Sequence, residues 1–101
     1  MLNTREVYFV LKNLETVQNL DELSEFYGYG RSTLRAQKAK GQQPDLAAWV
    51  RLWFTLNEVA RDTNEVIKTA HIDEKHEYQN GLKDLRNLQN QIWQTIEILA
   101  L

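Results

Sequence analysis

Residues 20–41, LDELSEFYGYGRSTLRAQKAKG, decide the fold. Two short segments with apolar residues at helical spacing flank a turn that contains Gly28 and Gly30, and glycine enters tight turns at little conformational cost. The first segment spans about residues 20–27, and Leu34 is the main apolar residue of the second. This arrangement predicts two short helices joined by a tight turn, which is a helix-turn-helix.

Residues at the ends of both segments support this prediction. Asn19 is the expected N-cap of the first helix, and Glu22 stands three residues later, as in a capping box. Ser32 is the expected N-cap of the second helix, which is too polar to be buried, and Gly41 is expected to stop it. The inner face of the first helix is expected to consist of Leu20, Leu23, Phe26 and Tyr27.

Positive charge is concentrated in this part of the chain, although the whole chain has a net charge of −2. Residues 31–51 carry five basic groups and one acidic group, whereas residues 1–30 and residues 52–101 each have a net charge of −3. Because phosphates respond to charge within a Debye length of about 10 Å, a local basic region matters more than the overall balance. The distribution therefore permits a nucleic-acid partner.

A polar, basic helix after a tight turn is typical of a recognition helix in the major groove of DNA. Arg can bind guanine with two hydrogen bonds, and Ser or Thr can contact several bases, whereas Lys further along is suited to phosphate. The alternative is an ordinary helical hairpin with a solvated basic face. The residues expected to contact double-stranded DNA are Arg31, Ser32, Thr33, Arg35, Gln37, Lys38, Lys40 and Gln42.

Residues 27–36, YGYGRSTLRA, resemble the turn and recognition helix of the lambda-repressor-like helix-turn-helix family. Residues 38–46, KAKGQQPDL, resemble the bacteriophage CI-type repressor subgroup, and the similarity covers about residues 20–56. The resemblance implies that Arg31, Ser32, Thr33 and Arg35 face the bases and that Leu34 is buried. The chain departs from the family at Leu20, where a DNA-contacting Gln is common, and at Ser24, where a small Ala is usual at the helix crossing.

Helices on both sides are expected to hold this unit. An N-terminal helix begins at Asn3 or Thr4, and the aromatic Tyr8 and Phe9 are expected to join its core face. That face is formed by Val7, Val10, Leu11, Leu14 and Val17.

After the basic helix, Pro44 is expected at the first position of a central helix that is apolar nearly all round. A new helix is expected to begin at Asp62, and Asn80-Gly81 is expected to interrupt the chain again. The central contacts are expected from Trp49, Trp53 and Leu56 or Phe54.

The C-terminal segment has apolar residues at intervals of three and four, as in a short coiled-coil seam. We expect a homodimer through this stripe; packing of the stripe on the chain's own core is the alternative. The expected dimer residues are Leu82, Leu85, Leu88, Ile92, Trp93, Ile96 and Leu99. The chain is therefore expected to comprise a DNA-binding domain over residues 1–60 and a helical extension over residues 61–101.

Other functions find no support in the sequence. The chain has no Cys, and His71 and His76 are five residues apart in a polar stretch, so no metal site is expected. There is no recognisable nucleophile pattern or phosphate-binding loop, so we expect neither an enzyme nor a cofactor. No leader or membrane-spanning segment is apparent, so a soluble, cytoplasmic protein is expected.

These observations predict an all-α domain of four to five helices with a long C-terminal helix. The function they favour is a sequence-specific transcriptional regulator, a repressor of a phage or mobile element. It is expected to bind a palindromic operator as a dimer, with recognition helices about 34 Å apart. The alternative is a protein-interaction module, such as an antirepressor, that keeps the helix-turn-helix fold.

Overall fold

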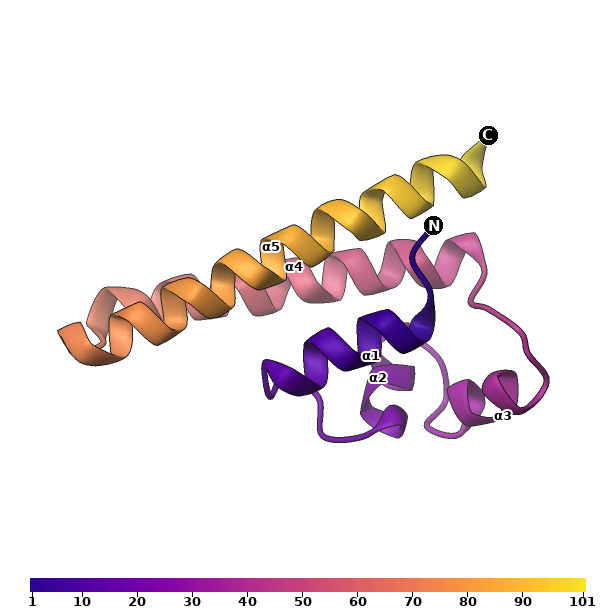
Figure 1. Cartoon of the computed structure of the whole chain (residues 1–101), viewed down its shortest axis with the longest axis horizontal. Helices are drawn as coiled ribbons and strands as arrows, with labels where there is room; N and C mark the ends of the chain where they lie inside the picture. The colour runs from indigo at the N-terminus through magenta and orange to yellow at the C-terminus, as the bar shows by residue number, and fades with distance from the viewer.

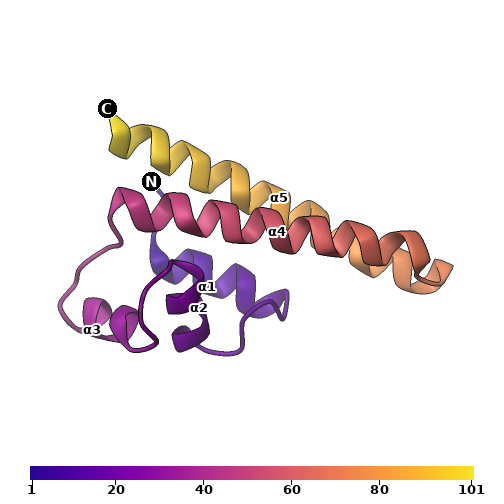
Figure 2. The ribbon, with the colours of Figure 1, turned by 180° about the vertical axis from the view of Figure 1, so that it is seen from behind.

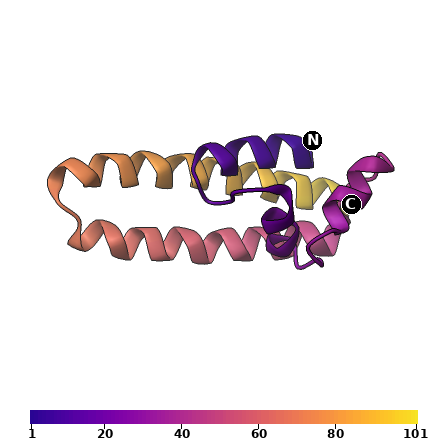
Figure 3. The same ribbon diagram turned by 90° about the horizontal axis from the view of Figure 1, so that it is seen from below.

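Five helices form two layers in the computed structural model, which describes residues 1–101 (Figures 1 and 3). The two long C-terminal helices lie side by side as an antiparallel hairpin, and the three short helices cover one side of it. The prediction of an all-α fold with a long C-terminal helix is confirmed. The helices are α1 (Thr4–Asn13), α2 (Leu20–Phe26), α3 (Thr33–Ala39), α4 (Leu46–Thr69) and α5 (Ile72–Ala100).

The α4–α5 hairpin is longer and more regular than the sequence predicts. α4 runs without a break past Asp62, and α5 runs through Asn80-Gly81. Both expected breaks are wrong because packing overrides local preference: a glycine inside a helix costs only about 1 kcal/mol relative to Ala. The chain turns instead at Ala70 and His71, whose backbones are extended. None of the helices combines the length and apolarity needed to cross a membrane.

The core lies between the hairpin and the short helices. It contains buried side chains from α1, α2, α3, α4 and α5 in one cluster. Ala60, at the expected division between two domains, is fully buried inside α4. Residues 1–60 and the C-terminal half of α5 therefore share one core, and only the far end of the hairpin extends beyond the short helices (Figure 1).

α1 begins as predicted. Asn3 is its N-cap, and the Asn3 side chain accepts a hydrogen bond from the Glu6 N–H at 2.9 Å. Val7 and Leu11 are buried, but Phe9 is 68% exposed, so the expectation that it joins the core is wrong. Phe9 lies two residues from each of these core positions, and a spacing of two in a helix points to the opposite side.

Asp45, rather than Pro44, sets the start of α4. The Asp45 side chain accepts a hydrogen bond from the Ala48 N–H at 2.9 Å, so Pro44 lies one residue before the N-cap instead of at the first helical position. Trp49 is buried as predicted, and its indole N–H donates to the Pro44 carbonyl at 3.1 Å. Phe54, by contrast, is 56% exposed and lies outside this core.

Candidate nucleic-acid interface

Ser24 holds the two helices of the predicted helix-turn-helix together. It is fully buried where α2 meets α3. Its hydroxyl donates to the Gly30 carbonyl at 2.5 Å and accepts from the Leu34 N–H at 3.3 Å. Leu23 and Leu34 are buried on either side of this contact. At this position, a small Ala is usual in the lambda-repressor-like family that the sequence resembles. Ser24 instead makes two hydrogen bonds, which fix the start of α3.

The turn between the two helices depends on Gly28. Its φ of +82° is left-handed, as predicted for a glycine that ends a helix. A Cβ at this position would lie 3.0 Å from Arg51 Cγ, so a side chain here would have to displace the Arg51 side chain slightly, in addition to the strain of the left-handed backbone. Gly30, the second glycine of the turn, has no positive φ.

The expected caps differ in outcome. The Asn19 side chain accepts from the Glu22 N–H at 2.9 Å, and the Glu22 carboxylate accepts from the Gln18 N–H at 2.9 Å, which confirms a box-like start. Ser32 makes no side-chain cap hydrogen bond. Its φ of −92° and ψ of −4° are close to helical, whereas an N-cap side chain bonds the helix from an extended backbone. The Ser32 side chain is exposed and makes no hydrogen bond to α3, although the Ser32 carbonyl accepts from the Ala36 N–H at 3.1 Å.

Both predicted base-reading arginines are paired with acids on α2. Arg35 Nε lies 2.8 Å from Asp21 Oδ1, and Arg31 forms an ion pair with Glu25. Both arginine side chains remain more than half exposed. Exposed ion pairs contribute about 0–1 kcal/mol, so exchanging a carboxylate for a DNA contact costs little. The acids orient the two guanidinium groups on the open side of α2 and α3.

Two of the predicted residues, Gln37 and Lys38, lie beside α1 and line a groove of about 270 Å³ between α1 and α3. Gln37 is half-buried and its Oε1 is shielded from solvent. It therefore does not share the open surface of Arg35, and its contact with DNA stays a prediction. Gln42 lines the same groove, whose rim is closed by a hydrogen bond from the Thr4 N–H to Gln43 Oε1 at 3.3 Å. The remaining predicted residues, Thr33 (half-buried) and Lys40 (exposed), lie at the two ends of α3.

Arg5 on α1 is a further cation of this region that the sequence-based prediction does not include. Arg5 lines the α1–α3 groove together with Lys38, and neither side chain has an ion-pair partner. Lys12 lies two turns further along α1 and also shares a groove with Lys38, with its Nζ 5.5 Å from the Tyr8 ring centroid. The seven-residue interval between Arg5 and Lys12 places them on one helix face, and this spacing in the sequence is a signal of a basic face on α1. Unpaired positive charge thus extends from α3 onto α1.

Tyr27 connects the helix-turn-helix to α4. Its ring packs edge-on against Trp49, with centroids 5.4 Å apart, and stacks on Tyr29 at 6.1 Å. Burial raises the pKa of Tyr27, so the phenol stays neutral in the core. The turn between α2 and α3 is therefore anchored to the hairpin through the aromatic contact between Tyr27 and Trp49.

Most residues of the expected dimer stripe are buried in the core of the monomer. Leu85, Leu88, Ile92 and Ile96 are at most 7% exposed because they pack within the monomer core. Leu82 is also partly buried against this core. These five residues follow the alternative, packing on the chain's own core, and are not a free surface. Of the stripe, only Trp93 and Leu99 are exposed.

Comparison with known proteins adds no further identification: no family model, curated protein or solved structure matches this chain significantly. Viewed from behind, α3 stands at the edge of the fold, clear of the hairpin (Figure 2). This helix and the charges around it are therefore the features that bear on function.

Proposed function

We propose that this protein is a sequence-specific DNA-binding transcriptional regulator, a repressor of a phage or mobile element in the lambda-repressor-like helix-turn-helix class. The observation that supports this most directly is that one residue of α3 is buried in the core while most of the helix surface is exposed. Leu34 is its only buried residue, and Ser24 fixes its start, so most of its surface is open. A short helix at the edge of the fold, anchored mainly through one buried residue, Leu34, leaves enough open surface to enter a major groove as a recognition helix does.

The charges around α3 suit a duplex. Arg31 and Arg35 lie at its N-terminal end, from which recognition helices contact base edges. Lys38 and Lys40 lie toward its C-terminal end, and Arg5 continues the positive charge onto α1. In the proposed complex the arginines exchange their carboxylate partners for bases, and the lysines and Arg5 contact phosphates.

We further propose that the regulator forms a homodimer, the oligomeric state expected from the sequence; the single palindromic operator with recognition helices about 34 Å apart is not part of this proposal. The buried residues of α5 cannot form the interface without opening the core, so we place the interface on a different, exposed surface of the C-terminal hairpin.

Selection of duplexes from a random pool, followed by fluorescence anisotropy, tests DNA binding. One sequence motif is expected to be enriched, and its affinity is expected to fall steeply with salt because cations displace counterions from phosphates. Arg35→Ala is expected to weaken binding to the enriched duplex about 10–100-fold, since a two-bond contact to guanine contributes about 1–3 kcal/mol. Arg61→Ala, an exposed arginine on α4, is the control and should bind as the parent protein does. Unchanged binding by Arg35→Ala would remove α3 from the role of recognition helix.

A protein-interaction module is the second candidate, and the charge of α2 supports it. α2 has no basic residue and carries Asp21, Glu22 and Glu25. Two of these acids pair with the arginines of the α3 side, which lowers the net positive charge there. If the selection enriches no duplex while the protein remains folded, this candidate replaces the first.

A further inference from the structure

An aromatic cluster lies exposed on the hairpin, outside the core and away from α3. Trp53 packs edge-on against Phe54, with ring centroids 5.1 Å apart, and its ring is tilted against that of Trp93, with centroids 5.5 Å apart. Phe54 and Trp93 are 56% and 45% exposed. These three residues line a shallow groove between α4 and α5, together with Asn90, Gln94 and Glu97. Contiguous apolar surface of this kind marks interaction sites more often than solitary exposed residues do.

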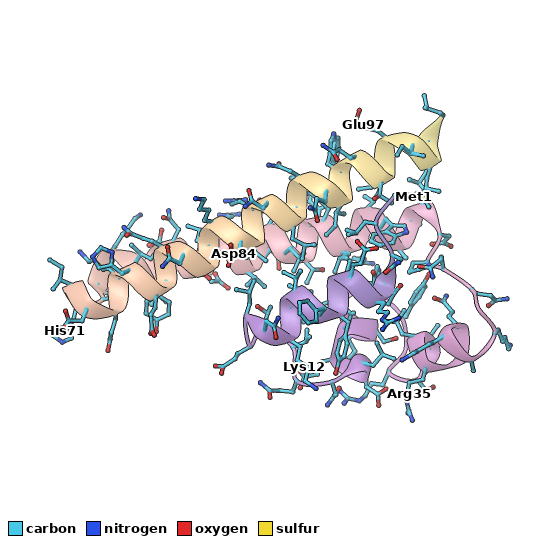
Figure 4. The ribbon with its side chains drawn as sticks, in the orientation of Figure 1. Met1, Lys12, Arg35, His71, Asp84 and Glu97 are labelled. Carbon is cyan, nitrogen blue, oxygen red and sulfur yellow. The ribbon has the colours of Figure 1, made fainter.

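This aromatic face is on the side of the hairpin opposite to the short helices. No residue of α1, α2 or α3 lines its groove. Glu97, at one end of the groove, points away from the layer that carries Arg35 (Figure 4). The aromatic face is therefore free to bind a partner while α3 is free to bind DNA.

A polar network beneath the cluster holds one edge of the face. Gln89 is buried, and its amide N–H₂ donates to the Trp53 carbonyl at 3.4 Å. Arg86 Nη1 donates to Asn57 Oδ1 at 2.9 Å and to Gln89 Oε1 at 2.7 Å. Arg86 is nevertheless exposed and has no ion-pair partner, so its charge is positioned but not neutralised.

The exposed stripe of α5 at this face is Arg86, Asn90, Trp93 and Glu97. The intervals are four, three and four residues, so the spacing is the same in both directions along the helix. The charges at the two ends are opposite, and about 16 Å of helix separates them. An antiparallel copy of the same stripe would place each Arg86 opposite the partner's Glu97, and each Trp93 beside the partner's Asn90.

We propose that a second copy of this chain docks on the aromatic face, with the two α5 helices antiparallel. The interface is isologous, so each favourable contact occurs twice. The aromatic residues lie at its centre and the Arg86–Glu97 pairs at its rim, which is the usual anatomy of a protein–protein interface. The mixed charge of the face favours its own copy over a strongly acidic or strongly basic partner, because either would meet a like charge.

The position of α3 follows from this geometry. The two-fold axis of the dimer lies in the plane of the aromatic face, so the two α3 helices point to opposite outer sides. One dimer would therefore hold two separate duplexes rather than two adjacent half-sites on one duplex. This consequence depends on the proposed DNA-binding function, whereas dimerisation through the aromatic face does not.

Analytical ultracentrifugation of the full chain without DNA tests the dimer. The parent protein is expected to sediment as a concentration-dependent dimer. Glu97→Arg creates two Arg–Arg contacts and is expected to raise the dimer dissociation constant about tenfold or more. Adding Arg86→Glu to Glu97→Arg restores opposite charges and is expected to recover dimer formation. Glu77→Arg makes the same charge change at an exposed position outside the groove and should leave the dimer unchanged.

Because Arg86 supports the buried Gln89, the double variant can fail for structural reasons, and a second measurement covers that case. The chain has no Cys, so Asn90→Cys introduces a single thiol. In the antiparallel dimer the two residues at position 90 are only three residues, about 4.5 Å, apart along the helix axis. A short bismaleimide should then link two copies of Asn90→Cys but not of Glu77→Cys.

Two results would overturn the proposal: a parent protein that stays monomeric at all concentrations, or a dimer that Glu97→Arg leaves intact and Asn90→Cys does not crosslink. Neither result bears on DNA binding, which anisotropy with a single short duplex measures separately. Failure of the dimer and failure of the proposed function are therefore distinguishable.

Discussion

Replacing Ser24 by Ala tests whether the Ser24 hydroxyl holds the helix-turn-helix together. The change removes one oxygen from a fully buried site and adds no bulk, so it perturbs hydrogen bonding alone. Two bonds are lost: the one donated to the Gly30 carbonyl at 2.5 Å and the one accepted from the Leu34 N–H at 3.3 Å. Each intramolecular hydrogen bond contributes about 0.5–1.5 kcal/mol net, so Ser24→Ala should lower the free energy of unfolding by about 1–3 kcal/mol.

Thermal unfolding followed by circular dichroism measures this effect. For a chain of this size, 1 kcal/mol corresponds to about 4–8 °C in Tm, so a decrease of about 4–24 °C is expected. Ser32→Ala is the matched control, because Ser32 is exposed and makes no cap hydrogen bond; its effect should stay within about 0.5 kcal/mol. If Ser32→Ala is as destabilising as Ser24→Ala, Ser32 caps α3 in solution and the hydrogen bonds assigned to Ser24 do not hold the unit.

Three further substitutions test the surroundings of the site. Asp21→Asn removes a negative charge beside α3 and should raise DNA affinity a few-fold in anisotropy, whereas Glu65→Gln, which breaks an ion pair near the far end of α4, should not. Ile92→Asp buries a charge in the core and should unfold the protein by circular dichroism; a folded monomer would instead indicate that Ile92 belongs to a dimer seam. Gly28→Ala should lower stability by about 1–2 kcal/mol in urea titration, and by more than Gly41→Ala, which has a similar φ but open space around it.

The sequence predicts local elements well where one short-range interaction determines them. Asn3 and Asn19 cap their helices as expected, because an Asn side chain bonds a backbone N–H three residues on. Gly28 has the expected left-handed φ. Asn80-Gly81 misleads because its preference for a turn is weaker than the packing of a continuous α5 against α4.

Features that depend on contacts between distant segments are harder to predict from the sequence. The interval of three and four along α5 is compatible with a partner helix or with α4, and only the fold shows that Ile92 faces the core. Similarly, the ion pair between Arg35 and Asp21 joins residues 14 positions apart on two helices. The site residues named from the sequence lie together around α3, but which of them face outward, as Arg35 does, or inward, as Gln37 does, depends on the position of α1.

The composition of α3 is more informative than its length suggests. A helix of seven residues is unstable alone, and here Leu34 and Ser24 supply the tertiary contacts that hold it. Folding therefore constrains few of the other side chains of α3. Polar residues of any charge at these exposed positions would be compatible with the fold. Yet the segment from Gly30 to Pro44 contains four basic residues and no acidic one, whereas the rest of the chain carries an excess of acidic groups. Solubility alone does not require this segregation of charge, and a polyanionic partner, such as the DNA that we propose, would account for it.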